Sequence, residues 1–473
     1  MKIIKLIACC AALLTVSGCY DKDEPNDIAY VTAIGIDKNE NNKDNYNITV
    51  QFANPTNISG GSGEEGGSGK DIMNNITVEA PNIYSAVGLI DHVISKNLNL
   101  SHMKLFVFSK EIAEDGIKDF LETISRSEEI RPNVYTAVSV KKAGEYLRDT
   151  EPLVEINPAK YYQLIFEKGE FSAVPPSYNQ NLYFYTNIPE KNSVIPLTGI
   201  AESTESGDES QSSSQGGGEG GGSSGESGGG SGGGSGGGES GGSGGSENKG
   251  QGSSKSEASG ESSDQQNKNQ SQAPINKSPY EYNLKDYKAG EVGIYQNKKG
   301  EAIGCAVFKM DKMIGELGFI ETQLYNMLTN SFTQNYITIK SDKSDTPITL
   351  LISLDNRTKI KYNKKEHKST IKLNLSGDFI SLPDNYLAEY DLENFEKAAT
   401  TAITEKISDF IKMTQAEFNS DIIGFGMHAK SKFLTLKDFT DFDWENKYKD
   451  MKYEIETDFN VRRTGLTSRT GTK

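Results

Sequence analysis

The feature that most constrains this chain of 473 residues is a Gly/Ser-rich stretch from about Glu202 to Ala273. It contains no aromatic and no branched aliphatic side chain, as the runs Gly216-Gly-Gly-Glu and Gly228-Gly-Gly-Ser illustrate. Such a segment cannot bury enough apolar surface to offset the entropy lost on folding, so we predict that it is disordered. It could be a tether that extends the reach of the chain or a tolerated loop insertion. The small closure entropy of a long loop favours the insertion.

The N-terminus has the composition of an export signal. Two lysines precede an apolar run from Leu6 to Val16, and small residues follow it. The run is too short to span a bilayer, which needs roughly 20 apolar residues. Val16-Ser-Gly-Cys19 resembles a bacterial lipobox, in which the cysteine takes a diacylglycerol and becomes the mature N-terminus. We therefore expect a lipoprotein signal peptide over residues 1–18 and lipid attachment at Cys19, the alternative being a plain secreted protein.

Cysteine usage and charge limit the chemistry of the mature chain. Of four cysteines, two belong to the predicted signal, Cys19 would carry lipid, and Cys305 remains in the apolar run Ala302–Phe308. This context favours a buried structural thiol over a nucleophile. The formal net charge is −16, and loss of Lys2 and Lys5 takes it to −18 (−16 − 2). A net charge this negative argues against nucleic acid as a partner, because nucleic-acid binding requires a basic surface. It also argues against electrostatic binding to anionic lipid, so the acyl chains would have to anchor the protein.

Before the insert, β-rich segments alternate with amphipathic ones, which predicts an N-terminal α/β domain. The predicted strands cover residues 29–37, 46–52, 76–80, 103–108 and 133–140, and the predicted helices cover 83–95 and 112–125. The first two strands flank a polar turn and are expected to form a hairpin. The glycine cluster at 59–70 lacks the spacing of a phosphate-binding loop and is interpreted as a turn between strands.

After the insert, the pattern is strand-rich and ends with one long helix. Strands are predicted at residues 291–296, 302–308, 313–317, 336–340, 348–354, 358–362 and 369–375. Apolar residues at helical spacing from Leu392 to about Asn419 predict the helix, and Gly424 and Gly426 are expected to stop it. The fold class is therefore α+β, with mixed sheets, packed helices and about three domains.

Motifs of catalysis and metal binding are missing from this pattern. The four histidines are scattered without ligand spacing, and there is no Gly-x-Ser-x-Gly motif. Abundant carboxylates pair by chance and do not indicate acid–base chemistry. We expect no enzymatic activity, no cofactor and no metal.

Several segments together resemble the C subunits of nutrient germinant receptors, the GerC-type spore germination lipoproteins. They run in order along the chain: Cys19-Tyr-Asp, Val31–Asp37, Ser101–Phe108 with Glu111–Gly116, Ser125–Arg131, Ala306–Leu317 with Glu321-Thr322, Asp421–Gly426 and Val461–Leu466. The Gly/Ser-rich insert is the departure, because the family has a short loop there. The resemblance implies a non-catalytic lipoprotein at the outer face of the spore inner membrane, in complex with integral-membrane A and B subunits.

The resemblance also suggests domain boundaries. We predict an N-terminal α/β domain over residues 19–195, a small β-rich middle domain over 196–330 that the insert 202–273 interrupts, and a C-terminal α+β domain over 331–473. The alternative function is a lipid-anchored solute-binding protein of a transporter. That class usually has two similar lobes around one cleft, which fits a strand-rich domain with one long helix less well.

Five charged residues are candidate partner contacts. Lys309, Lys312 and Glu321 flank apolar strands, and Arg462 and Arg463 could face a membrane or an acidic partner surface. Each could instead belong to an ordinary solvated face or strand end. The sequence does not indicate which germinant is sensed, or whether this subunit binds it.

Overall fold

The computed structural model describes residues 27–53, 73–150, 157–167, 192–203, 280–282, 285–294, 300–341, 344–382 and 392–463, with single positions at 152, 155, 174 and 175. These residues belong to one compact unit, formed by residues 1–206 and 275–473. The predicted signal peptide, Cys19, the glycine cluster at 59–70 and residues 204–273 of the predicted insert lie outside the described residues. The described part is α+β with mixed sheets, which confirms the predicted fold class.

The first sheet has nine strands in the order β12-β11-β7-β6-β5-β1-β2-β3, with β4 paired to the start of β1. Their bounds are β1 Ile28–Lys38, β2 Tyr46–Ala53, β3 Met73–Ala80, β4 Asn97–Asn99, β5 Leu105–Ser109, β6 Tyr135–Ser139, β7 Asn192–Ile200, β11 Gly300–Lys309 and β12 Lys312–Leu317. β1 and β2 form the predicted hairpin, with Ile36 opposite Ile48. β5 pairs in parallel with β1, β6 with β5, and β7 with β6.

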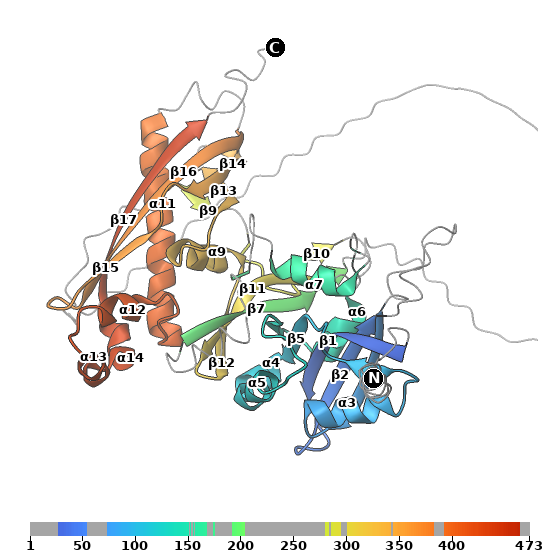
Figure 1. Ribbon diagram of the computed structural model, residues 1–473. Coiled ribbons are helices and arrows are strands. Elements are labelled where there is room, and N and C mark those ends of the chain that lie inside the picture. The colour runs from blue at the N-terminus through green and yellow to red at the C-terminus, as the bar shows by residue number, and fades with distance from the viewer. Residues whose placement is uncertain are drawn as a thin grey trace, which may run out of the picture. The chain divides into compact units, whose positions relative to one another are not determined.

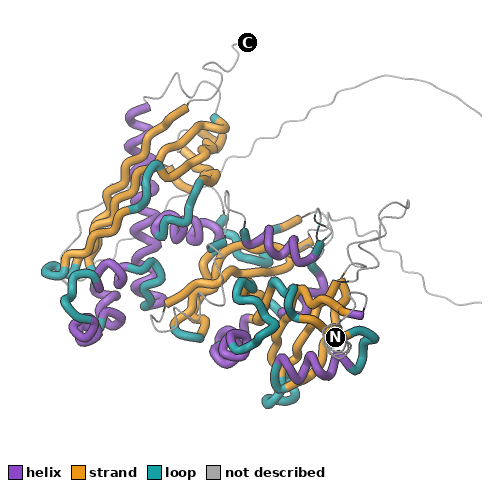
Figure 2. Tube along the Cα trace, in the orientation of Figure 1, coloured by secondary structure: helices purple, strands orange, loops and turns teal. Residues whose placement is uncertain are grey.

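Helices cover both faces of this sheet (Figures 1 and 2). One layer consists of α3 (Ile83–Asp91), α4 (Lys110–Asp115) and α5 (Lys118–Ser125). The other consists of α6 (Ala143–Asp149) and α7 (Pro158–Phe166). The central strands are buried on both sides, so every residue of β5 and β6 is buried and the two strands do not alternate between buried and exposed positions.

The second sheet has the order β15-β16-β14-β13-β9, with β17 parallel to β16. Its strands are β9 Tyr280–Tyr282, β13 Gln334–Ser341, β14 Ser344–Leu354, β15 Lys359–Asn363, β16 Lys368–Ser381 and β17 Lys452–Arg463. The helices of this half are α9 Phe319–Leu328, α11 Leu392–Met413, α12 Phe425–Lys430, α13 Leu436–Phe442 and α14 Trp444–Lys447, with a 3-10 turn at Tyr448–Asp450. A further pair, β8 Glu202–Ser203 and β10 Gly293–Ile294, is parallel. In Figure 1, α11 lies along β17.

Strand β11 contributes to two cores at once. Its side chains alternate, so Ala306 and Phe308 enter the core of the first sheet, whereas Cys305 and Val307 enter the core of the second half. The strand pairs with β7 on one edge and β12 on the other. Cys305 is fully buried, as predicted for a structural thiol. Strands on both sides of the insert thus form one sheet.

Two predicted helices differ in detail from the observed ones. The segment 112–125 is not one helix, because Gly116 has φ 125° and separates α4 from α5. The long helix begins at Leu392 as predicted, and α11 continues as a π-helical turn at Thr414–Phe418. Asn419, in a left-handed conformation with φ 43°, ends it. The expectation that Gly424 and Gly426 stop this helix was therefore wrong. No described helix has the length and apolarity to cross a bilayer.

Candidate functional site

The segment Asp421–Gly426 folds into a cradle around one carboxylate. Asp421 Oδ1 accepts hydrogen bonds from the amides of Gly424 and Phe425, both at 2.9 Å. Asp421 Oδ2 accepts from the Gly426 amide at 2.5 Å and from Trp444 Nε1 at 2.9 Å. These four donors occupy the lone pairs of the carboxylate. Burial raises the pKa of Asp421, and the four hydrogen bonds act in the opposite direction.

The two glycines of this segment have separate structural roles. Gly424 has φ 91°, a left-handed conformation that glycine adopts without steric cost. A Cβ on Gly426 would lie 2.7 Å from Trp444 Nε1 and 3.2 Å from Asp421 Oδ2. The spacing Asp-x-x-Gly-x-Gly thus allows the chain to wrap around its own carboxylate. Because that carboxylate is saturated, it positions the chain rather than offering a ligand.

The cradle forms one wall of a cavity of about 720 Å³. The end of α9 also lines the cavity, and there Asn330 (φ 62°) is hydrogen-bonded to Thr358, just before β15. Asn330 Oδ1 accepts from the Thr358 amide at 2.6 Å, and Thr358 Oγ1 donates to the Met327 carbonyl at 2.7 Å. The remaining lining comes from the first residues of β7 and from α12, α13 and α14. Cavities that hold small ligands are typically 300–1,000 Å³.

Exposed apolar and basic side chains lie on α12, on α13 and on the loop between them, and three of them, Met427, Lys430 and Leu436, line the cavity. We define the rim as these three residues together with Lys432, Leu434 and Lys437 of the same segment. Leu434 is 100% exposed, Leu436 65% and Met427 55%. Three exposed apolar side chains within ten residues make this segment a candidate interaction surface.

The loop that presents Leu434 is braced on both sides. The Phe433 ring lies 5.4 Å from the Phe439 ring and 5.0 Å from the Phe442 ring, measured between centroids. Lys364 Nζ lies 3.7 Å from the centroid of the Phe433 ring. A reciprocal capping box between Thr435 and Asp438 then starts α13. The residues on either side of Leu434 are therefore fixed by packing and capping contacts, while Leu434 itself is exposed.

His428, on α12 like Lys430, also lines the cavity. Burial lowers its pKa, although the nearby Asp421 charge acts to raise it. Within the described ranges, no three His, Cys, Asp or Glu side chains gather in a way that could hold a metal ion. Tyr325, Phe439 and Trp444 give the lining of the cavity aromatic surface.

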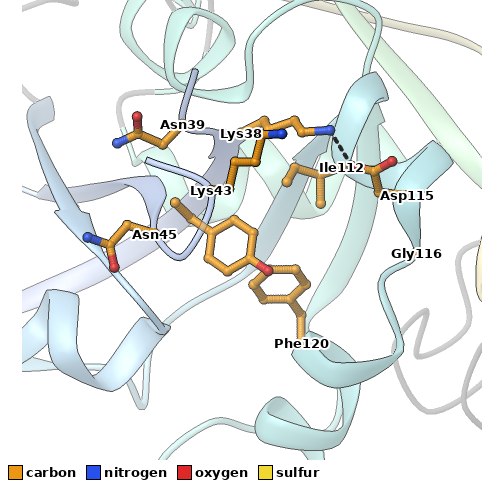
Figure 3. A pocket seen from close by; sticks show the side chains of 9 residues that line it. Lys38, Asn39, Lys43, Asn45, Ile112, Asp115, Gly116 and Phe120 are labelled. Atoms are coloured by element: carbon orange, nitrogen blue, oxygen red, sulfur yellow. Dashed lines mark hydrogen bonds and ion pairs between the residues drawn. The ribbon is translucent and has the colours of Figure 1, made fainter. Parts of the chain in front are cut away.

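A second recess, of about 320 Å³, lies between the β1–β2 turn and the α4–α5 helices (Figure 3). Lys38 and Asp115 point toward each other there and form an ion pair at 2.5 Å. Their side chains are 47% and 62% exposed, so water screens the pair. This recess is smaller and has a charged pair at its edge, so we consider it the weaker candidate.

The five predicted contact residues lie in three separate places. Lys309 and Lys312 face each other across the β11–β12 hairpin, where Lys309 Nζ donates to the Asn419 carbonyl at 3.2 Å and Lys312 is exposed. Glu321 lies in the first turn of α9, and its carboxylate accepts from the Gly318 amide at 3.0 Å. Arg462 and Arg463 are exposed at the end of β17, and Arg462 pairs with Asp378 at 3.4 Å.

Sequence reasoning did not identify the cavity or its rim. The segment Asp421–Gly426 entered the sequence analysis through the resemblance and through its two glycines as expected helix stops, and Trp444 and Leu434 did not enter it. The available signal was an acid followed by glycines three and five positions later, a spacing that allows an aspartate to cap the next helix. The exposure of Leu434 has no counterpart in the sequence, where it follows a phenylalanine and looks like a core residue.

Comparisons with known proteins agree on one family. The family described as "Spore germination protein N-terminal domain" matches residues 21–200, and "Spore germination B3/GerAC like, C-terminal" matches residues 303–465. Together they span well over half of the chain, on both sides of the insert.

Individual relatives match over shorter stretches. Spore germination protein KC of Bacillus subtilis (strain 168) is 28% identical over 166 residues, 34% of this chain and 40% of that protein. The putative spore germination protein YfkR of the same organism is 26% identical over 159 residues, 33% of this chain and 39% of that protein. The chain thus matches about two fifths of the length of these relatives. The crystal structure of the GerBC protein aligns with 91% of this chain and 96% of its own, at 11% identity and a TM-score of 0.42. The chain belongs to the GerC-type spore germination proteins, the family of germinant receptor C subunits.

Proposed function

We propose that this protein is a lipid-anchored, non-catalytic subunit of a nutrient germinant receptor. The observation that carries the proposal is that both family domains match, one before and one after the insert. In this proposal the lipid on Cys19 holds the protein at the outer face of the spore inner membrane. The protein then acts through contacts with the A and B subunits, and nutrient binding reaches it through them.

The rim is the surface that we propose for those contacts. It combines three exposed apolar side chains with three lysines, in a chain whose formal net charge is −16. A complementary partner surface would present an apolar recess surrounded by acidic residues. The braced loop favours such a role, because a preformed contact loses less conformational entropy on binding. Lys312, Arg462 and Arg463 remain proposed secondary contacts, while Lys309 donates to the Asn419 carbonyl and Glu321 accepts from the Gly318 amide within this chain.

The proposal predicts a specific loss of nutrient response. Spores that lack the gene should not germinate with nutrients but should germinate with calcium dipicolinate, and the intact gene should restore the nutrient response. Cys19→Ala should release the protein from membranes and impair the same response. A substituted protein that stays membrane-bound and active would show that the lipid is not the main anchor.

The rim is tested with a matched pair of substitutions. Leu434→Ser should reduce recovery of the A and B subunits with the tagged protein from solubilised spore membranes. Ile380→Ser, at another exposed apolar side chain, should leave recovery unchanged. Because Leu434 is fully exposed, its replacement should leave the thermal unfolding temperature unchanged. Full recovery of both subunits with Leu434→Ser would contradict the assignment of the rim.

The size of the cavity is the one observation that favours a second candidate function. A volume of about 720 Å³ suits a small ligand, as a solute-binding protein of a transporter would require. Isothermal titration of the purified protein with amino acids, sugars and short peptides distinguishes the two functions. Clean micromolar binding to one of them, with germination unaffected by loss of the gene, would favour the solute-binding function.

A further inference from the structure

Helix α3 presents apolar side chains to solvent as well as to the core. Ile83, Ala86 and Ile90 are buried beneath it, and the Asn82 side chain caps its first turn through the Ser85 amide. On the outer side, Tyr84 is 44% exposed and Leu89 is 51% exposed. Val93, in the turn that follows, is 69% exposed. We refer to Tyr84, Leu89 and Val93 as the α3 patch.

The segment that carries the patch is nearly uncharged. Residues 82–95 contain Asp91 as their single acid and no Lys or Arg, whereas charged residues make up 25% of the whole chain. The Asp91 carboxylate accepts a hydrogen bond from the Leu98 amide at 2.8 Å. An ordinary solvated helix face would carry several charges, so this composition is unusual for a surface in contact with water.

The topology joins the patch to the start of the described chain. β4 pairs in parallel with the first residues of β1, with Ile28 opposite Asn97. Parallel strands begin at the same edge of a sheet, so the chain arriving from Cys19 and the turn leaving α3 meet at this edge. Val93 precedes Asn97 by four residues, which places it within about 20 Å of Ile28.

The proposed lipid lies nine residues before Ile28. Nine residues span at most about 30 Å, so an acylated Cys19 would keep this edge of the sheet close to the bilayer surface. Tyrosine is favoured at the level of the lipid headgroups, and aliphatic side chains are favoured just below them. We propose that the α3 patch contacts the bilayer beside the lipid and fixes the orientation of the protein on the membrane. This inference rests on the proposed acylation of Cys19.

The test uses the full chain with processed and acylated Cys19, in vesicles of phosphatidylglycerol and phosphatidylethanolamine. Single cysteines at Leu89→Cys, Val93→Cys or the exposed control Ile380→Cys carry an environment-sensitive fluorophore. Acylated Cys19 does not react with the label. Cys305 is buried, and burial raises the pKa of its thiol to about 12, so it does not compete for the label.

We expect labels at positions 89 and 93 to show blue-shifted emission and to be quenched by lipids that carry a spin label near the headgroup. The label at position 380 should show neither effect. A water-like, unquenched label at position 89 on vesicle-bound protein would overturn the inference. A blue shift without quenching by spin-labelled lipid would also overturn it, because the patch would then be covered by a second copy of the chain.

Mass spectrometry of the mature N-terminus separates this inference from the proposed anchor. An acylated Cys19 with a water-exposed patch would leave the anchor intact and reject the membrane contact. A chain without the acyl group would remove the anchor, and the inference would fail with it. Leu89→Ser with Val93→Ser should abolish the quenching of a label placed at Tyr84→Cys while the acyl chains keep the protein on the vesicles.

Discussion

Replacing Asp421 with asparagine keeps the size of the side chain but changes its hydrogen bonding. The carboxylate accepts from two amides through Oδ1, and from the Gly426 amide and Trp444 Nε1 through Oδ2. In Asp421→Asn, an amide nitrogen takes the place of one oxygen and faces two donors that it cannot satisfy. The substitution should therefore destabilise the C-terminal half of the protein.

The magnitude follows from the number of donors that are left without an acceptor. A buried polar group that loses its partner costs about 1–3 kcal/mol, and two such groups are created. Part of this cost is offset, because burial raises the pKa of Asp421 and a neutral side chain avoids the desolvation of a charge. We expect a decrease of about 2–4 kcal/mol in the free energy of unfolding, a large part of the 5–15 kcal/mol that is typical of domains.

The assay is urea unfolding followed by the fluorescence of Trp444, which is the single tryptophan of the chain and lies in the cradle itself. Asp441→Asn, the same substitution at an exposed position on α13, is the control and should leave the transition unchanged. If Asp421→Asn unfolds at the same urea concentration as the control, with the same folded-state emission, the carboxylate does not hold the cradle and the reasoning is refuted.

Two further predictions concern the contact between the β11–β12 hairpin and its neighbours. A Cβ on Gly315 would clash with the Phe418 ring at the end of the π-helical turn, so Gly315→Ala should destabilise by about 1–3 kcal/mol. Adding Phe418→Leu should recover part of this loss in a double-mutant cycle, and strictly additive losses would argue against the contact. Partial burial of Glu316 favours its protonation, but Lys110 at 2.7 Å and Lys288 at 3.3 Å lower its pKa below the ordinary 4.5. A lowered pKa means that the unfolded state binds the proton more tightly, so the contribution of Glu316 is fully present above pH 4.5 and is lost as the pH falls through the folded-state pKa. Wild type and Glu316→Gln should therefore differ in stability at neutral pH and converge in acid, and a difference that persists in acid would exclude the ion pairs as its cause.

Local patterns were sufficient to predict most elements. Two β-rich runs on either side of a polar turn predicted the hairpin of β1 and β2, and helical spacing predicted α11 together with the π-helical turn that follows it. An apolar run predicted β5 as a buried strand, and a β-rich run predicted the strand β6. These features depend on neighbours within a few positions, so periodicity in the sequence reports them directly.

Features that depend on distant residues could not be predicted in this way. The pairing of β11 with β7 joins segments on the two sides of the insert, and alternation marks a strand without naming its partner. The predicted helix at 112–125 is interrupted at Gly116, which has a φ of 125° and separates α4 from α5. The short helices α12 to α14 were also missed, because four to seven residues carry too little periodic signal.

The sequence by itself determined the fold class, the buried strands, the long helix, the family and the expected lipid site, because composition, periodicity and motif order are local properties. Only the tertiary structure decided what the charged and apolar side chains do. The fourth hydrogen bond to the Asp421 carboxylate comes from Trp444, which is 23 residues away in the sequence. Leu434 and Leu89, which resemble core residues in the sequence, are exposed because neighbouring elements bury other faces of the same segments. Burial is a property of the whole packed chain, and for that reason the candidate surfaces became visible only in three dimensions.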